Sequence, residues 1–232
     1  MRNPLVPVKL ALAVLRLVRD PNRLDVVFSL SDALVDDPRA SALFDETNRR
    51  PEVAPACAAR LRTPRLDLDA LAKLPDGSFG RAAETFFRTN GLDPDALPRR
   101  DATTDVEWLN AHLYETHDLW HVATGFSPDV AGELGLQAFY AAQLGGPFPL
   151  LILVAGLLNT VIFAPLETRV RLAAIARGWT MGANARLFIG LDWAALLPMP
   201  MSDVKARLAL EGPEGPRANS NVPVKELLPS PV

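Results

Sequence analysis

The stretch "ETHDLWHVATGFSPDVAGELG", residues 115–135, decides how we interpret this chain. It contains two of the three histidines, His117 and His121, together with the carboxylates Asp118 and Glu133. The large apolar residues in its first half recur with helical periodicity, which predicts a helix. At roughly 100° per residue, the two histidines lie about 40° apart around the helix, and Asp118 lies about 60° from His121. Three potential metal ligands therefore share one side of this helix.

A second helix is predicted to follow after a short connection. Gly125 is typical of a helix end, and Ser127 followed by Pro128 is typical of an N-cap and a first turn. We expect this second helix to run antiparallel to the helix over 106–122, so that Glu133 meets the three ligands of the first helix. Two imidazoles and two carboxylates suit zinc best here, while manganese, iron and magnesium remain open. The alternative is a polar seam in which the histidines only hydrogen-bond to carboxylates.

Other polar residues of this segment are predicted to lie outside the cluster. His112 falls on the opposite side of the helix from His121, and Glu115 lies about 200° from His117, which indicates a structural or solvent-facing role. A phosphohydrolase of the His-Asp type competes with the metal interpretation, but it needs a separate upstream histidine, and His112 points away. The sequence contains no Gly-rich phosphate loop, nucleophile elbow or paired cysteine motif.

The composition indicates a single all-α domain. Hydrophobic residues make up 49% and charged residues 22% of the 232 residues, so the chain can bury one sizeable core. Apolar residues recur every three or four positions through 24–46, 52–62 and 80–90, while 21 prolines and 14 glycines divide the chain into many short helices. We therefore predict one multi-helix domain over residues 1–210 and a disordered tail over 211–232, which is rich in Pro, Gly and Asn.

Charge and cysteine content restrict the class of function. The formal net charge of -3 gives no basic face for nucleic acid, so nucleic-acid binding is excluded as the main function. The single cysteine, Cys57, cannot form an internal disulfide, which fits a reducing compartment.

Two apolar segments suggest contact with lipid. Residues 5–19 predict an amphipathic helix that either packs on the domain or lies at a membrane surface. Lys9 and Arg16 interrupt its apolar run, so we expect no signal peptide.

Between Glu133 and Glu167 there is no charged side chain. The apolar core of that stretch, about fifteen residues, is shorter than the ~20 needed to cross a bilayer. It predicts a buried central helix, a membrane-dipping helix, or the wall of an apolar channel for a long ligand.

These motifs together resemble one family. The order His117, Asp118, two residues, His121, eleven residues, Glu133 is similar to the signature of the coenzyme Q (ubiquinone) biosynthesis protein family of Coq-four type. The segments "LPDGSFGR" at 74–81 and "GELGLQAFYAAQLGGPFP" at 132–149 also resemble that family. The resemblance covers roughly residues 70–210.

The resemblance implies a mostly helical metalloprotein that acts on the ring of a polyprenylated hydroxybenzoate. The implied reaction is metal-dependent decarboxylation at C1, with or without coupled hydroxylation, and His117, Asp118, His121 and Glu133 would hold the divalent ion. Within the resembling segment "GSFGR", Arg81 is the candidate that would meet the substrate carboxylate. The charge-free stretch after Glu133 would provide the apolar channel for the prenyl tail.

The resemblance also implies a location and partners. The protein would attach peripherally to the membrane that holds ubiquinone precursors, on the cytoplasmic face of a bacterial inner membrane or on the matrix side of the mitochondrial inner membrane. Its partners would be the lipid substrate, other ubiquinone biosynthesis enzymes and the membrane surface; self-association is left open. The alternative function is a non-catalytic scaffold or lipid-binding protein that organises the biosynthetic complex around a structural metal.

Overall fold

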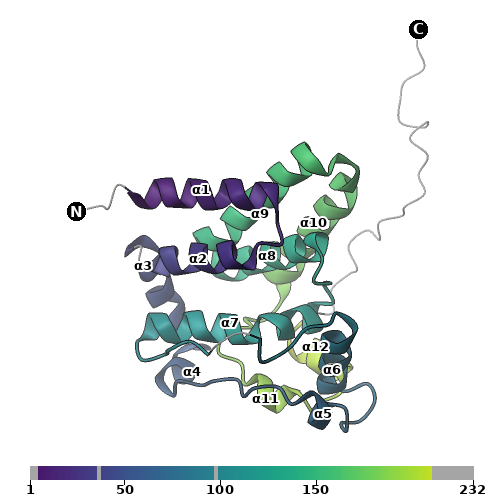
Figure 1. Ribbon diagram of the computed structural model, residues 1–232. Coiled ribbons are helices and arrows are strands. Elements are labelled where there is room, and N and C mark those ends of the chain that lie inside the picture. Colours follow the sequence, from purple (N-terminus) through teal and green to yellow (C-terminus); the bar gives the residue numbers. More distant parts are fainter. Residues whose placement is uncertain (1–4, 36–37, 97–98, 211–232) are drawn as a thin grey trace.

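The computed structural model describes residues 5–35, 38–96 and 99–210. Within these ranges every regular element is a helix, and the only strand-type pairing is one bridge between Ser78 and Pro200. In chain order the elements are α1 (Leu5–Arg19), α2 (Leu24–Val35), α3 (Pro38–Asn48), α4 (Ala54–Ala58), α5 (Leu68–Leu71), α6 (Phe79–Thr89), α7 (Asp105–Thr124), α8 (Val130–Leu144), α9 (Pro147–Phe163), the 3₁₀ helix η1 (Pro165–Glu167), α10 (Thr168–Asn184), α11 (Trp193–Leu196) and α12 (Met201–Arg207) (Figure 1). The prediction of a single, mostly helical domain is confirmed. The predicted tail, 211–232, lies outside the described residues.

The larger of two apolar cores surrounds α7 and holds aromatic side chains from distant parts of the chain. Trp120 of α7 is completely buried, and its ring stacks on that of Tyr140 from α8 at a centroid distance of 4.2 Å. Phe188 and Trp193 pack on the same indole at 5.0 and 6.4 Å. Because aromatic rings bury large areas and have few rotamers, this cluster fixes α7 against α8.

The smaller core joins α1, α2 and α9, and it has five buried members: Leu17, Val18, Val26, Leu30 and Ala155. A polar network continues it between α1, α9 and α10. The buried Arg171 guanidinium donates to Asn159 Oδ1 at 2.7 Å and to Thr160 Oγ1 at 3.0 Å, and Asn159 Nδ2 donates to the Val18 carbonyl at 2.9 Å. These bonds account for the polar residues that interrupt the apolar run of α9.

Glycine permits very close contact between α8 and α10. A Cβ atom on Gly178 would lie 1.9 Å from the carbonyl oxygen of Gly135, and one on Gly182 would lie 2.7 Å from that of Phe139. Both distances are shorter than any real contact, so only glycine fits. Consequently α8 packs mainly along α10.

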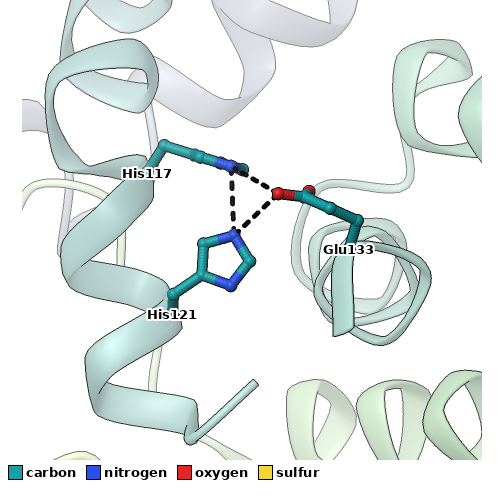
Figure 2. Close-up of side chains that lie close together, drawn as sticks. All are labelled: His117, His121 and Glu133. Carbon is teal, nitrogen blue, oxygen red and sulfur yellow. Dashed lines mark hydrogen bonds and ion pairs between the residues drawn. The ribbon is translucent and has the colours of Figure 1, made fainter. Parts of the chain in front are cut away.

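The arrangement of α7 and α8 differs from the antiparallel hairpin that the sequence predicts. Figure 2 shows α8 nearly end-on while α7 lies across the view, so the two helices cross steeply.

The start of α8 also lies later than predicted. Its N-cap is Asp129, whose carboxylate accepts the Gly132 N–H at 2.7 Å, while the Ser127 hydroxyl donates to Asp129 at 2.8 Å. The serine therefore supports the cap instead of forming it.

The apolar core of the charge-free stretch forms α9, which is not a buried central helix, one of the three interpretations of that segment. The first part of the stretch belongs to α8. One side of α9 packs on α1 and the smaller core, but Leu150, Val154 and Val161 are 50%, 48% and 75% exposed on the other side.

No single helix among the described residues is both long and apolar enough to cross a membrane. Within the described part of the chain, one pair of helices meets that criterion together, α9 with Pro165–Asn184, and this pair is bent by 120°.

Candidate metal centre

Local sequence signals place both histidines on the last turns of α7. The helix begins with a capping box, in which the Thr104 hydroxyl accepts the Glu107 N–H and the Glu107 carboxylate accepts the Thr104 N–H. It ends at Gly125, which has a φ of 70°. His117 and His121, one turn apart, therefore point to the same side of a helix whose two ends are fixed.

A tight turn brings Glu133 to the histidines. A Cβ atom on Gly132 would lie 2.0 Å from the Ser127 carbonyl oxygen, so the chain can fold back at this point only because residue 132 is glycine. Glu133 follows in the first turn of α8. The Gly-Glu pair in the sequence thus has a structural reason: the glycine permits the turn that aims the carboxylate at α7.

Three ligand atoms converge between the two helices. Glu133 Oε1 lies 3.0 Å from His121 Nε2 and 3.7 Å from His117 Nε2, and the two Nε2 atoms are 3.3 Å apart (Figure 2). Among the described residues, these three side chains form the group of His, Cys, Asp or Glu whose ligand atoms all lie within 4.8 Å of one another. Two imidazoles and one carboxylate form a ligand set for zinc or for non-haem iron.

The far sides of both imidazoles also have partners. His121 Nδ1 lies 3.1 Å from the Phe126 carbonyl oxygen, and His117 Nδ1 lies 3.4 Å from Tyr140 Oη. A carbonyl oxygen only accepts, so His121 carries its proton on Nδ1, and in the neutral ring the Nε2 lone pair faces Glu133. A lone pair and a carboxylate repel each other unless a cation lies between them. The cluster therefore requires either a proton among these three atoms, which His117 Nε2 can carry, or a metal ion.

The electrostatics of the cluster favour positive charge. Burial disfavours the charged form of His117, but its hydrogen bond and charge interaction with Glu133 outweigh burial and raise the pKa of His117. Burial by itself would raise the pKa of Glu133, yet the contacts with His117 and His121 outweigh it and hold that pKa far below its usual range. Without metal, a proton on an imidazole occupies the place of the cation.

This competition predicts that metal affinity depends on pH. Because contact with Glu133 raises the pKa of His117, its imidazole is protonated at pH values below this raised pKa and must lose the proton to bind metal. We expect the apparent affinity for Zn²⁺ to fall by up to about tenfold per pH unit below the raised pKa and to level off above it. Competition titrations with a chelating indicator between pH 5.5 and 8 measure this. An affinity independent of pH over that range would contradict the assignment of His117 as a ligand.

Two residues predicted for the site lie outside this group. Asp118 is on α7 next to His117, but its carboxylate does not join the three ligand atoms; its charge helps to raise the pKa of His117. The Arg81 guanidinium, on α6, donates to the Ala72 carbonyl oxygen and lies 3.7 Å from Asp76 Oδ1. The cluster thus contains three residues that could bind a metal, where the sequence predicts four.

The other polar residues of α7 agree with the sequence analysis. Glu115 has a structural role, since its carboxylate pairs with both Arg62 and Arg99. His112 is buried away from the cluster, where its Nε2 accepts the Gly190 N–H at 3.1 Å. Burial lowers the pKa of His112 to about 4, so this ring is neutral.

Sequence reasoning missed the residues that support the imidazoles. Tyr140 contacts His117, and the Phe86 ring stacks on His121 at a centroid distance of 5.7 Å. Tyr140 follows Glu133 by seven residues, two helical turns, so helix periodicity could have placed it on the same face. Phe86 comes from α6, and the sequence contains no signal for its contact with α7.

Comparison with known proteins decides the family. The model of the family described as coenzyme Q (ubiquinone) biosynthesis protein Coq4 matches residues 11–214. The chain belongs to this Coq4 family. A relative from Coprinopsis cinerea, named as a mitochondrial ubiquinone biosynthesis protein, is 29% identical over 223 residues, which cover 90% of this chain and 72% of the relative. A relative with the same name from Laccaria bicolor is 30% identical over 171 residues, which cover 72% of this chain and 56% of the relative.

A solved structure shares the fold. The crystal structure of a Nostoc punctiforme protein, described as a candidate ubiquinone biosynthesis protein, superposes with a TM-score of 0.78 at 28% identity and covers 89% of this chain and 99% of that one. The chain spans about half the length of several curated Coq4 relatives.

Proposed function

We propose that this Coq4 protein is a metal-dependent lyase that removes the C1 carboxylate from a polyprenylated hydroxybenzoate precursor of ubiquinone. The observation that carries the proposal is the convergence of His117, His121 and Glu133 beside an apolar cavity. Three protein ligands leave positions open on a divalent ion, which favours a catalytic metal over a closed structural one. Zinc and iron both suit this ligand set.

The cavity beside Glu133 supports a substrate with an apolar tail. It has a volume of about 50 Å³ between the α1–α2 corner, α8 and α9, and Leu17, Val27, Leu134, Ile152, Ala155 and Gly156 form its apolar lining. This volume is too small for a prenyl chain. We propose that only the part of the substrate next to the ring enters it, and that the rest of the tail lies along α9 toward lipid.

In the proposed reaction the bond between C1 and the carboxylate breaks, carbon dioxide leaves, and the electron pair stays on the ring until a proton reaches C1. In the oxidative variant a hydroxyl group from water takes the place of the carboxylate, which leaves as carbon dioxide, and dioxygen accepts the two electrons and two protons that are released and becomes hydrogen peroxide. When bound, the metal supplies Lewis acidity toward a substrate oxygen. The protein residues hold the ion through two imidazoles and one carboxylate, and the apolar lining excludes water, which would otherwise stabilise the substrate carboxylate.

An exposed apolar surface supports peripheral attachment to a membrane. Large apolar side chains on α1, α9, η1 and α10 are exposed, and these elements lie together at the top of Figure 1. We call this set the apolar surface: Val8, Leu12, Leu15, Leu150, Val154, Leu157, Leu158, Val161, Ile162, Phe163, Leu166, Val170, Leu172 and Trp179. Exposed patches of this kind mark membrane or protein contacts. We propose that this surface enters the interface of the membrane that holds the substrate, with Arg16 and Arg19 of α1 near lipid phosphates.

Replacing Glu133 by Gln tests the proposed reaction. The amide keeps the size of the side chain but removes the charge that attracts a cation, so we expect a strain that depends on this gene to lose ubiquinone and to accumulate the carboxylated precursor. Lipid extracts analysed by mass spectrometry, with protein abundance measured in parallel, provide the readout. The matched control is Glu46→Gln, at an exposed position on α3, which should leave ubiquinone unchanged. Normal ubiquinone with Glu133→Gln at normal abundance would overturn the catalytic proposal and favour the scaffold.

A further inference from the structure

The two imidazoles of the candidate centre are not held equally. The His121 side chain is 1% exposed, its Nδ1 faces the Phe126 carbonyl oxygen, and its ring stacks on Phe86. The His117 side chain is 32% exposed, and the partner of its Nδ1 is the hydroxyl of Tyr140. Tyr140 is therefore the main group that orients His117. His121, in contrast, is held by a backbone carbonyl and by the surrounding core, and no single side chain fixes its orientation.

We infer that Tyr140 is a positioning residue of the metal centre, which holds the His117 imidazole so that Nε2 faces Glu133 and His121. This inference rests on the metal centre of the proposed function, but not on the reaction. Groups that bond to the outer nitrogen of a metal-ligating histidine fix its ring and its tautomer, and their loss typically weakens metal binding by about 10- to 100-fold.

The phenol is itself rigidly placed. The Tyr140 ring stacks on Trp120 with an interplanar angle of 6°, and the Trp120 indole N–H donates to Thr116 Oγ1 at 3.0 Å. Trp120 is completely buried and Tyr140 is 7% exposed. Because this stack belongs to the larger core, the phenolic oxygen is a fixed point against which the partly exposed imidazole of His117 can be oriented.

A hydroxyl can serve both states of the site. When a metal binds at Nε2 of His117, the proton of the neutral ring is on Nδ1, and Tyr140 Oη accepts it. When no metal is bound and Nε2 carries the proton, the Tyr140 hydroxyl can donate to Nδ1 instead. A backbone carbonyl, such as the one that faces His121, can only accept. When the metal-free ring is neutral with its proton on Nε2, loading with metal should therefore reverse the direction of the hydrogen bond between Tyr140 and His117.

Tyr140→Phe tests this role, because it removes the hydroxyl and keeps the ring that stacks on Trp120. We expect the affinity of the full-length protein for Zn²⁺, measured by competition with a chelating indicator, to fall about tenfold or more. The matched control is Tyr114→Phe, which removes the only other phenolic hydroxyl of the chain and should leave the affinity unchanged. Long-range ¹H–¹⁵N spectra of the Zn²⁺-loaded wild type should show the His117 proton on Nδ1.

The outcomes separate this inference from the proposed function. If the wild type binds Zn²⁺ and Tyr140→Phe binds it equally well, Tyr140 has no positioning role, while the metal centre stands. If the His117 proton of the loaded wild type lies on Nε2, the inferred hydrogen bond is wrong. If the wild type binds neither Zn²⁺ nor Fe²⁺, the metal centre fails and this inference fails with it. A thermal unfolding curve of Tyr140→Phe distinguishes lost affinity from lost folding.

Discussion

His121→Ala is expected to weaken the binding of Zn²⁺ by roughly a hundredfold to a thousandfold, because structural zinc sites bind with about 10–16 kcal/mol shared among four ligands. Of the two histidines proposed as ligands, His121 makes the shorter contact to Glu133, 3.0 Å, and its Nδ1 faces the Phe126 carbonyl oxygen, which orients the ring. Its loss also leaves the Glu133 carboxylate without its closest partner. Isothermal titration or indicator competition at pH 7.5 measures the effect.

The chain offers a matched control for this substitution. His112 lies on the same helix and is buried to the same extent, at 1% exposed, but it faces Gly190 instead of the cluster. His112→Gln keeps an acceptor for the Gly190 N–H and should leave metal affinity within about twofold of the wild type, since it removes no ligand. Equal metal affinity of His121→Ala and the wild type would show that the cluster is a hydrogen-bonded polar seam.

The double variant Leu158→Glu and Val161→Glu is expected to abolish recovery of the protein with lipid vesicles. Both side chains belong to the apolar surface, at 43% and 75% exposed, and lie on one side of α9. Full burial of such a side chain contributes about 1.5–3 kcal/mol, of which each residue loses the part that its exposed surface represents. Each new carboxylate also resists transfer out of water, so the partition coefficient should fall by about a hundredfold. Flotation with vesicles of phosphatidylethanolamine and phosphatidylglycerol measures the bound fraction. The substitutions remove no buried contact of the cores, so the melting temperature should be unchanged.

A second double variant controls for the added charge. Thr89→Glu and Asn90→Glu add the same two charges at the exposed end of α6, which lies away from the apolar surface in Figure 1. This variant should still float with the vesicles. Recovery of the wild-type protein in the lipid-free fraction would contradict membrane attachment. In that case the sedimentation of the wild type and of the Leu158→Glu and Val161→Glu double variant should be compared. An oligomer of the wild type that the two substitutions dissociate would show that the apolar surface is a contact between copies of the chain.

The sequence by itself determined the features that depend on local chemistry. The spacing of His117 and His121 places them one turn apart on any helix, and Gly125 ends that helix by adopting a positive φ. The position of Glu133 soon after the break made it the expected fourth ligand, and it is one of the three residues that do converge. These features follow from periodicity and from turn residues, which act over a few residues and therefore can be read from sequence.

Only the tertiary structure decided how the helices meet and which side chains complete the site. The close contact of Gly135 with Gly178 aligns α8 with α10, and α8 therefore crosses α7 steeply. That crossing brings Glu133 to both imidazoles and leaves Asp118 outside the group, although helix geometry places Asp118 beside them. The same packing places Tyr140 on His117 and leaves one side of α9 exposed. Periodicity shows which residues share a face of a helix, but the neighbour that covers that face depends on contacts between segments far apart in the chain.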